Sequence, residues 1–232
     1  MKEKIRKINI RAIYMILSVI VCAVAMSLVD GVIQPQYFVK SFIKIGLFLI
    51  LPIAYFLVDR SMLPEVKTLF KPRLRDIAIA LGLGAIVYGF IVGGYFVLRN
   101  VIDFSGVASQ LTESAGVSAD NFLYVSLYIS FVNSFLEEFL FRGFAFISLK
   151  KTTSRAFAYL FSALAFALYH TGMTAGWFNI GIFVLTLVGL MAAGFIFNFL
   201  NEKSGNIYTS WIVHMFANFG INTVGFILFG MI

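Results

Sequence analysis

The sequence is poor in charge, cysteine and histidine. Charged residues make up 12% of its 232 residues, half of the roughly 25% found in soluble globular domains. The single cysteine, Cys22, excludes an internal disulfide framework and a CxxC metal site. Hydrophobic residues, in contrast, make up 60% of the chain and form several long runs. This composition favours a polytopic membrane protein over a soluble one.

The apolar runs predict an all-α fold, a polytopic transmembrane helical bundle with about seven spans. We expect one membrane domain over residues 1–232, with N-terminal spans and an extracytoplasmic connector in 1–120 and a core in 121–232. A basic N-terminus and an Ala-Val-Ala triplet would also suit a signal peptide, but the length of the first run favours an uncleaved helix. The expected spans are 12–29, 42–58, 77–98, 122–149, 156–170, 178–200 and 207–232.

The net charge of +7 describes topology rather than a nucleic-acid partner, which we do not expect. Most basic residues lie in the N-terminus and in the connectors 60–75, 150–155 and 201–206. These connectors alternate along the chain, so the positive-inside rule predicts a cytoplasmic N-terminus. The connector 99–121 falls on the other side and is long enough to hold a re-entrant segment.

Three ionisable side chains interrupt the fourth apolar run, 122–149. On a helix Glu138 and Arg142 are four residues apart and can pair, whereas Glu137 is turned by about 100° from Glu138. Burying a charge inside a membrane costs free energy, so we hypothesise that these residues have a function. A structural ion pair plus a glutamate facing a polar gap explains the same stretch equally well.

The two histidines of the chain also fall in predicted spans. At ~1.5 Å per residue, Glu137, His170 and Asn218 each lie ~20–22 Å along their helices from the cytoplasmic ends, and His214 lies ~16 Å. His214 and Asn218 share one helix face, because they are four residues apart. A lone buried histidine is usually a packing residue, but similar depth on three helices favours a shared site.

These polar residues resemble the three-motif signature of the CPBP family of intramembrane proteases, which includes the type II CAAX prenyl proteases and the bacterial Abi proteins. The resemblance covers about residues 121–232, and the motifs occur in order. They are Glu137-Glu138-x-x-x-Arg142, Phe166-x-x-x-His170 and His214-x-x-x-Asn218.

The resemblance implies a catalytic role for four residues. Glu137 and His170 would hold and deprotonate a water molecule, and His214 and Asn218 would form the oxyanion hole. These roles agree with the chemistry of peptide hydrolysis, which needs an activated water and stabilisation of the oxyanion.

Supporting roles fall to Glu138, Arg142 and Phe166, with the ion pair of the first two fixing the helix. A zinc cofactor is the alternative, because one glutamate and two histidines can complete a catalytic zinc sphere with water. The chain lacks an HExxH motif, and we favour a glutamate-type peptidase without a tightly bound metal. The zinc ligands would be Glu137, His170 and His214.

We therefore expect an intramembrane endopeptidase that cleaves membrane-associated peptides or proteins near the cytoplasmic half of the lipid bilayer. A short chain without added domains resembles bacterial members of the family, which implies a bacterial plasma membrane and roles such as bacteriocin processing. Two alternatives are a non-catalytic membrane partner or immunity protein of the same fold, and a proton-coupled transporter. Complete motifs argue against the first, and the lack of an internal repeat argues against the second.

Overall fold

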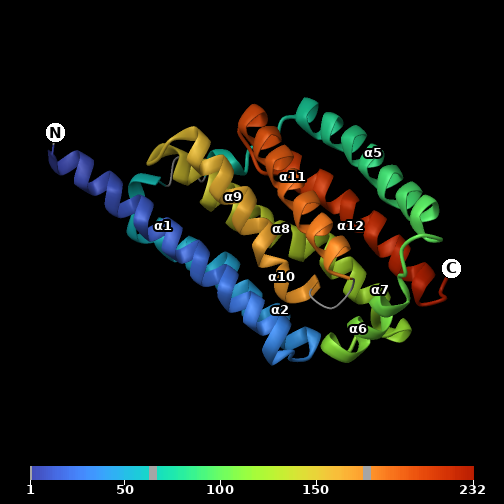
Figure 1. The fold of residues 1–232 in the computed structure, drawn as a ribbon. Helices are drawn as coiled ribbons and strands as arrows, with labels where there is room; N and C mark the ends of the chain where they lie inside the picture. The colour runs from blue at the N-terminus through green and yellow to red at the C-terminus, as the bar shows by residue number, and fades with distance from the viewer. Residues whose placement is uncertain (1, 63–66, 175–178) are drawn as a thin grey trace.

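Helices form the bundle, and the described residues contain no strand. The computed structural model describes residues 2–62, 67–174 and 179–232. The long helices run side by side along one direction (Figure 1). The all-α helical bundle predicted from the apolar runs is therefore confirmed.

The helices follow one another with short connectors. The first part of the chain forms α1 (Lys2–Leu28), η1 (Val29–Ile33), α2 (Tyr37–Ile45), η2 (Gly46–Ile50), α3 (Leu51–Val58), η3 (Arg60–Met62) and α5 (Leu74–Leu98). The middle forms α6 (Ser105–Ala115), α7 (Ala119–Leu127), η4 (Tyr128–Asn133), α8 (Ser134–Glu137), η5 (Glu138–Ser148) and η6 (Leu149–Lys151). The last part forms α9 (Arg155–Tyr169), α10 (Thr171–Thr174), α11 (Ile180–Ser204) and α12 (Tyr208–Leu228).

Six helices among the described residues are long and apolar enough to cross a membrane. They match six of the seven predicted spans, with boundaries that differ by a few residues. The other predicted span, 122–149, is helical throughout as the consecutive segments α7 to η6, and it carries the three charged side chains. The six helices are Ile10–Ile33, Tyr37–Val58, Leu74–Leu98, Arg155–Thr174, Ile180–Ser204 and Tyr208–Leu228.

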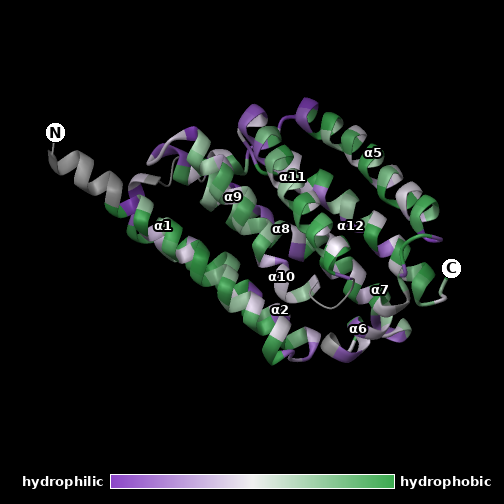
Figure 2. Cartoon of the chain, viewed as in Figure 1, coloured by the Kyte–Doolittle hydropathy of each residue, from purple (hydrophilic) through white to green (hydrophobic). Residues whose placement is uncertain are grey.

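The outer helices present apolar side chains to the surroundings. On α5, Ile86 and Phe90 are 69% and 80% exposed, and on α11 Ile180 is 76% exposed. Hydrophobic residues cover these helices along most of their length, and hydrophilic residues concentrate near the two ends of the bundle (Figure 2). This distribution is the one expected of helices whose outer faces contact lipid.

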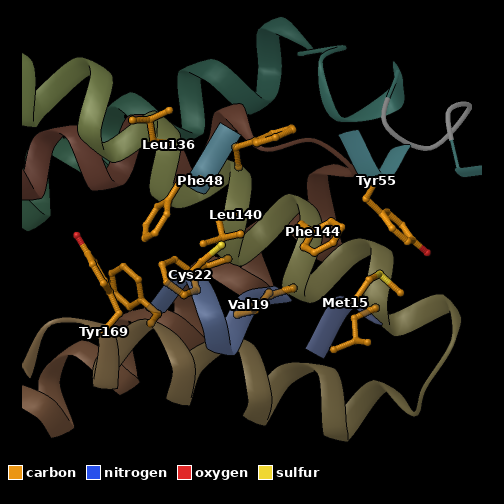
Figure 3. Close-up of a cluster of buried hydrophobic side chains, with 14 of the residues drawn as sticks. Met15, Val19, Cys22, Phe48, Tyr55, Leu136, Leu140, Phe144 and Tyr169 are labelled. Atoms are coloured by element: carbon orange, nitrogen blue, oxygen red, sulfur yellow. The ribbon is translucent and has the colours of Figure 1, made fainter. Parts of the chain in front are cut away.

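The largest buried cluster joins the N-terminal helices to the segment η5. Met15 and Val19 of α1 and Tyr55 of α3 lie in one cluster with Leu140 and Phe144 of η5 (Figure 3). Because lipid tails are as apolar as these side chains, close packing rather than removal from water holds helices together in a membrane. The N-terminal spans therefore embed the segment that carries the two glutamates.

Two groups of connectors define the ends of the bundle. At one end, Glu202 accepts hydrogen bonds from Arg155 at 2.7 Å and from Lys150 at 2.9 Å. Arg73 donates there to the Ser204 carbonyl at 2.7 Å. We call this the basic end. At the opposite end lie α6 and the C-terminus (Figure 1), and we call it the α6 end. The connector 99–121, for which a re-entrant segment was left open, contains the short helix α6 and the start of α7.

Candidate active site

The two glutamates lie where the winding of the central segment changes. The α-helix α8 ends at Glu137, and the π-helical segment η5 begins at Glu138. Glu137 is 2% exposed and Glu138 is fully buried. Because consecutive helical residues point in different directions, the two carboxylates have different neighbours. π-Helical segments are uncommon and are frequent at functional sites.

One carboxylate oxygen of Glu137 accepts hydrogen bonds from three side chains. Lys44 Nζ, Asn133 Nδ2 and Tyr169 OH donate to Oε1 at 2.6, 2.9 and 3.2 Å. The Lys44 ammonium also donates to the Asn133 side chain and, at 2.5 Å, to Tyr169 OH. All three ammonium protons therefore have acceptors. Lys44 is 4% exposed, so Glu137 has a buried counter-ion that comes from α2.

The other oxygen, Glu137 Oε2, is buried and accepts no hydrogen bond from the described residues. It lies 3.8 Å from His170 Nε2 and 3.6 Å from His214 Nε2. His170 Nδ1 lies 2.7 Å from the Phe166 carbonyl oxygen. Because a carbonyl only accepts, Nδ1 carries the proton and Nε2 has the lone pair. Glu137 Oε2 and His170 Nε2 are thus two acceptors that face each other, at a spacing that one water molecule can bridge.

Glu138 connects the central segment to α12. Its Oε1 accepts from His214 Nδ1 at 2.9 Å, and its Oε2 accepts from the Ser210 hydroxyl. Arg142 Nε lies 3.5 Å from Oε2, so the predicted ion pair is present. The prediction was incomplete, however, because Glu138 also fixes the ring of His214. A carboxylate that accepts from one ring nitrogen of a histidine orients the ring and sets which nitrogen carries the proton.

Phe166 lies between Arg142 and the two histidines. The Arg142 guanidinium carbon is 4.0 Å from the centre of the Phe166 ring and 5.0 Å from that of Phe197. Phe166 also makes edge contacts with His170 and His214, with ring centres 4.7 and 5.8 Å apart. Arg142 is fully buried, and its guanidinium nitrogens form no hydrogen bond with the described residues. Cation–π contact therefore supplements its ion pair.

Asn218 lies one helical turn beyond His214 on α12 and is 8% exposed. Its side-chain nitrogen donates to the Ile129 carbonyl oxygen at 3.1 Å, which ties α12 to η4. Asn218, Glu137, His170 and His214 all line one cavity of about 610 Å³. The structure therefore brings together the four residues that the motifs singled out.

The sequence analysis missed three side chains of this site: Lys44, Asn133 and Tyr169. Lys44 had a signal, because it is the only charged residue in the run 42–58 and a lysine inside a span is costly. Asn133 precedes Glu137 by four residues and so shares its helix face. For Tyr169, no feature of the sequence indicated a role in the site except its position next to His170.

The alternative zinc ligands, Glu137, His170 and His214, do not fit a resident zinc well. The described residues hold no group of three His, Cys, Asp or Glu side chains placed for a metal ion. In addition, the Lys44 ammonium on the same carboxylate would repel a divalent cation.

Comparison with protein families gave one match, to the type II CAAX prenyl endopeptidase Rce1-like family, over residues 119–220. This segment is somewhat less than half of the chain and contains all three motifs. The match confirms the resemblance to the CPBP intramembrane proteases. Neither the comparison with curated proteins nor the comparison with solved structures gave a match.

Proposed function

Because the family model of the type II CAAX prenyl endopeptidase Rce1-like proteins matches residues 119–220, we propose that this protein is an intramembrane endopeptidase of membrane-associated peptides or proteins. One observation carries the proposal: Glu137 Oε2 faces the Nε2 atoms of His170 and His214 in a cavity among apolar helices. Peptide hydrolysis needs a held water and a place for the oxyanion. This arrangement supplies groups suited to both.

The proposed nucleophile is a water molecule that donates one hydrogen bond to Glu137 Oε2 and the other to His170 Nε2. As the water oxygen bonds to the scissile carbonyl carbon, Glu137 takes one of its protons. The protonated glutamate then gives this proton to the leaving nitrogen as the C–N bond breaks, which restores the carboxylate. The three donors on Oε1 support this assignment because they leave only Oε2 for the reaction.

His214 and Asn218 are the proposed donors to the oxyanion. Since His214 Nδ1 already donates to Glu138, donation from its Nε2 to the oxyanion requires a second proton on the ring. Asn218 Nδ2 carries two hydrogens, and one of them is bonded to the Ile129 carbonyl. Loss of a single oxyanion donor typically lowers the rate by ~10²–10³, and His214→Gln should retain part of the activity.

The test compares the membrane peptides of cells that express the wild type, Glu137→Ala or His170→Ala. Glu113→Ala is the matched control, because Glu113 is exposed on α6. We expect product peptides with the wild type and the control and none with the two site variants, all four proteins being inserted and folded. Product formation near the wild-type rate in either site variant would contradict the proposal.

We further propose a glutamate-type mechanism without a resident metal. Purified protein should then contain well under one zinc per chain, and phenanthroline should inhibit weakly. Elemental analysis of the wild type, His170→Ala and His214→Ala provides the measurement. One zinc per wild-type chain that is lost in both variants would overturn the glutamate-type mechanism while leaving the peptidase assignment in place.

A further inference from the structure

Among the described residues, the lining of the cavity that holds the site extends from the catalytic groups toward the α6 end of the bundle. Glu137, His170 and His214 line its inner part, whereas Gln34, Gln110 and Leu228 line it near the α6 end. Gln34 follows η1, Gln110 lies on α6 and Leu228 is the last residue of α12. None of the described residues that line it belongs to the connectors of the basic end.

Buried side chains fill the space between the site and the basic end. Arg142 and Ser162 are fully buried, and the Ser162 hydroxyl donates to the Phe141 carbonyl at 2.7 Å. Asn198 of α11 is also fully buried and donates to the Tyr159 carbonyl at 3.2 Å. This packed region joins η5, α9 and α11 and separates the catalytic groups from the basic connectors. In the part of the chain that the structure describes, these buried side chains therefore lie between Glu137 and the basic end.

The charge of the two ends differs sharply. Of the 18 lysines and arginines, all but Lys40, Lys44, Arg99 and Arg142 lie in the N-terminal segment or in the connectors of the basic end. Lys40 lies near the α6 end and is paired with Asp30 at 2.5 Å. Basic residues in short loops mark the cytoplasmic side of a membrane protein. The α6 end is thus the extracytoplasmic one by the same rule.

We propose that the substrate reaches the active site from the extracytoplasmic side, along the part of the cavity that lies near the α6 end; this inference rests on the proposed peptidase function. This proposal differs from the expectation of cleavage near the cytoplasmic half of the bilayer. That expectation used the depth of the residues along their helices and not the direction in which the cavity extends. The occupant is a peptide segment of a secreted or membrane-anchored chain.

The walls of the cavity match the chemistry of such a segment. Most of the described lining is apolar, and it includes Ile91 of α5, Leu190 of α11 and Phe166 of α9. Polar side chains lie among these residues, including Thr186 of α11 and Asn222 of α12. Apolar side chains on either side of the scissile bond pack against the apolar lining, and the polar groups offer hydrogen-bonding partners to peptide groups.

Two adjacent alanines of α11 provide a matched test of this path. Ala193 lines the cavity, whereas Ala192 is exposed on the outer face at nearly the same depth. Each is replaced by cysteine in a Cys22→Ser background, in which the serine keeps the buried donor to the Leu47 carbonyl. A small membrane-impermeant methanethiosulfonate anion is then applied to spheroplasts or to inverted vesicles. The reagent requires a thiolate and hence water.

We expect Ala193→Cys to react in spheroplasts and at least ten-fold more slowly in inverted vesicles, and Ala192→Cys to react in neither. Ser109→Cys on α6 and Lys151→Cys at the basic end report orientation, the first reacting only in spheroplasts and the second only in inverted vesicles. Reaction of Lys151→Cys in spheroplasts would overturn the orientation. Reaction of Ala193→Cys only in inverted vesicles, or in neither preparation, would overturn the path.

Labelling does not depend on catalysis, so the outcome is independent of the peptidase assignment. If Ala193→Cys reacts as expected while the peptides of the Glu137→Ala cells equal those of the wild type, the cavity path stands and the peptidase function fails. If the peptides differ but Ala193→Cys reacts only from the vesicle exterior, the function stands and the entry side is reversed.

Discussion

The pair of Lys44 and Glu137 is the most unusual feature of this site, and its removal gives a quantitative test. Lys44 Nζ and Glu137 Oε1 are 2.6 Å apart, with side chains 5% and 2% exposed. Breaking a buried ion pair by removing one partner costs ~3–5 kcal/mol, because the other charge stays buried without compensation. For a chain of this size each 1 kcal/mol lowers the melting temperature by ~2–4 °C. Lys44→Met should therefore melt on the order of 10 °C lower than the wild type.

A double-variant cycle isolates the interaction from the loss of packing. Glu137→Gln removes the negative charge and should also destabilise, whereas Lys44→Met combined with Glu137→Gln removes both charges. The combined loss should be clearly smaller than the sum of the single losses, because neither charge then remains unpaired. Thermal unfolding in detergent measures all three variants, and Lys71→Met, at an exposed lysine, serves as the control. Additive losses, or a Lys44→Met protein that melts with the wild type, would refute the reasoning.

Two further substitutions test the support of the site. Arg142→Ala should lower the free energy of unfolding by ~3–5 kcal/mol. Expression or the melting temperature should therefore fall, and activity should fall as a consequence. A stable but inactive protein would instead assign Arg142 to the chemistry. Gly172→Ala should destabilise by ~1–3 kcal/mol, because its added carbon would collide with the backbone of Ser27, as measured by thermal unfolding. Gly82→Ala is the control, since nothing lies within 4 Å of the added carbon there, and equal melting temperatures for the two alanine variants would refute the steric argument.

Several properties of this protein follow from the sequence by itself. Apolar runs of membrane-spanning length predicted the helical bundle, because backbone groups in lipid must satisfy one another within a helix. Charged and imidazole groups inside such runs are costly, so Glu137, Arg142 and His170 stood out without any structure. The spacing of Glu138 and Arg142 predicted their contact, because helix geometry alone places residues four apart on one face.

Only the tertiary structure decided which groups meet across helices. The partner of Glu137 is Lys44 on α2, and the partner of Glu138 is His214 on α12. Linear spacing carries no information about either pair, because the rotation and packing of separate helices determine them. The direction of the cavity depends on the same packing: buried side chains such as Ser162 lie between the site and the basic end, and the described lining extends toward α6. The sequence was enough to predict how far along its helix each catalytic residue lies. The side from which a substrate reaches these residues depends on how the helices pack in the bundle.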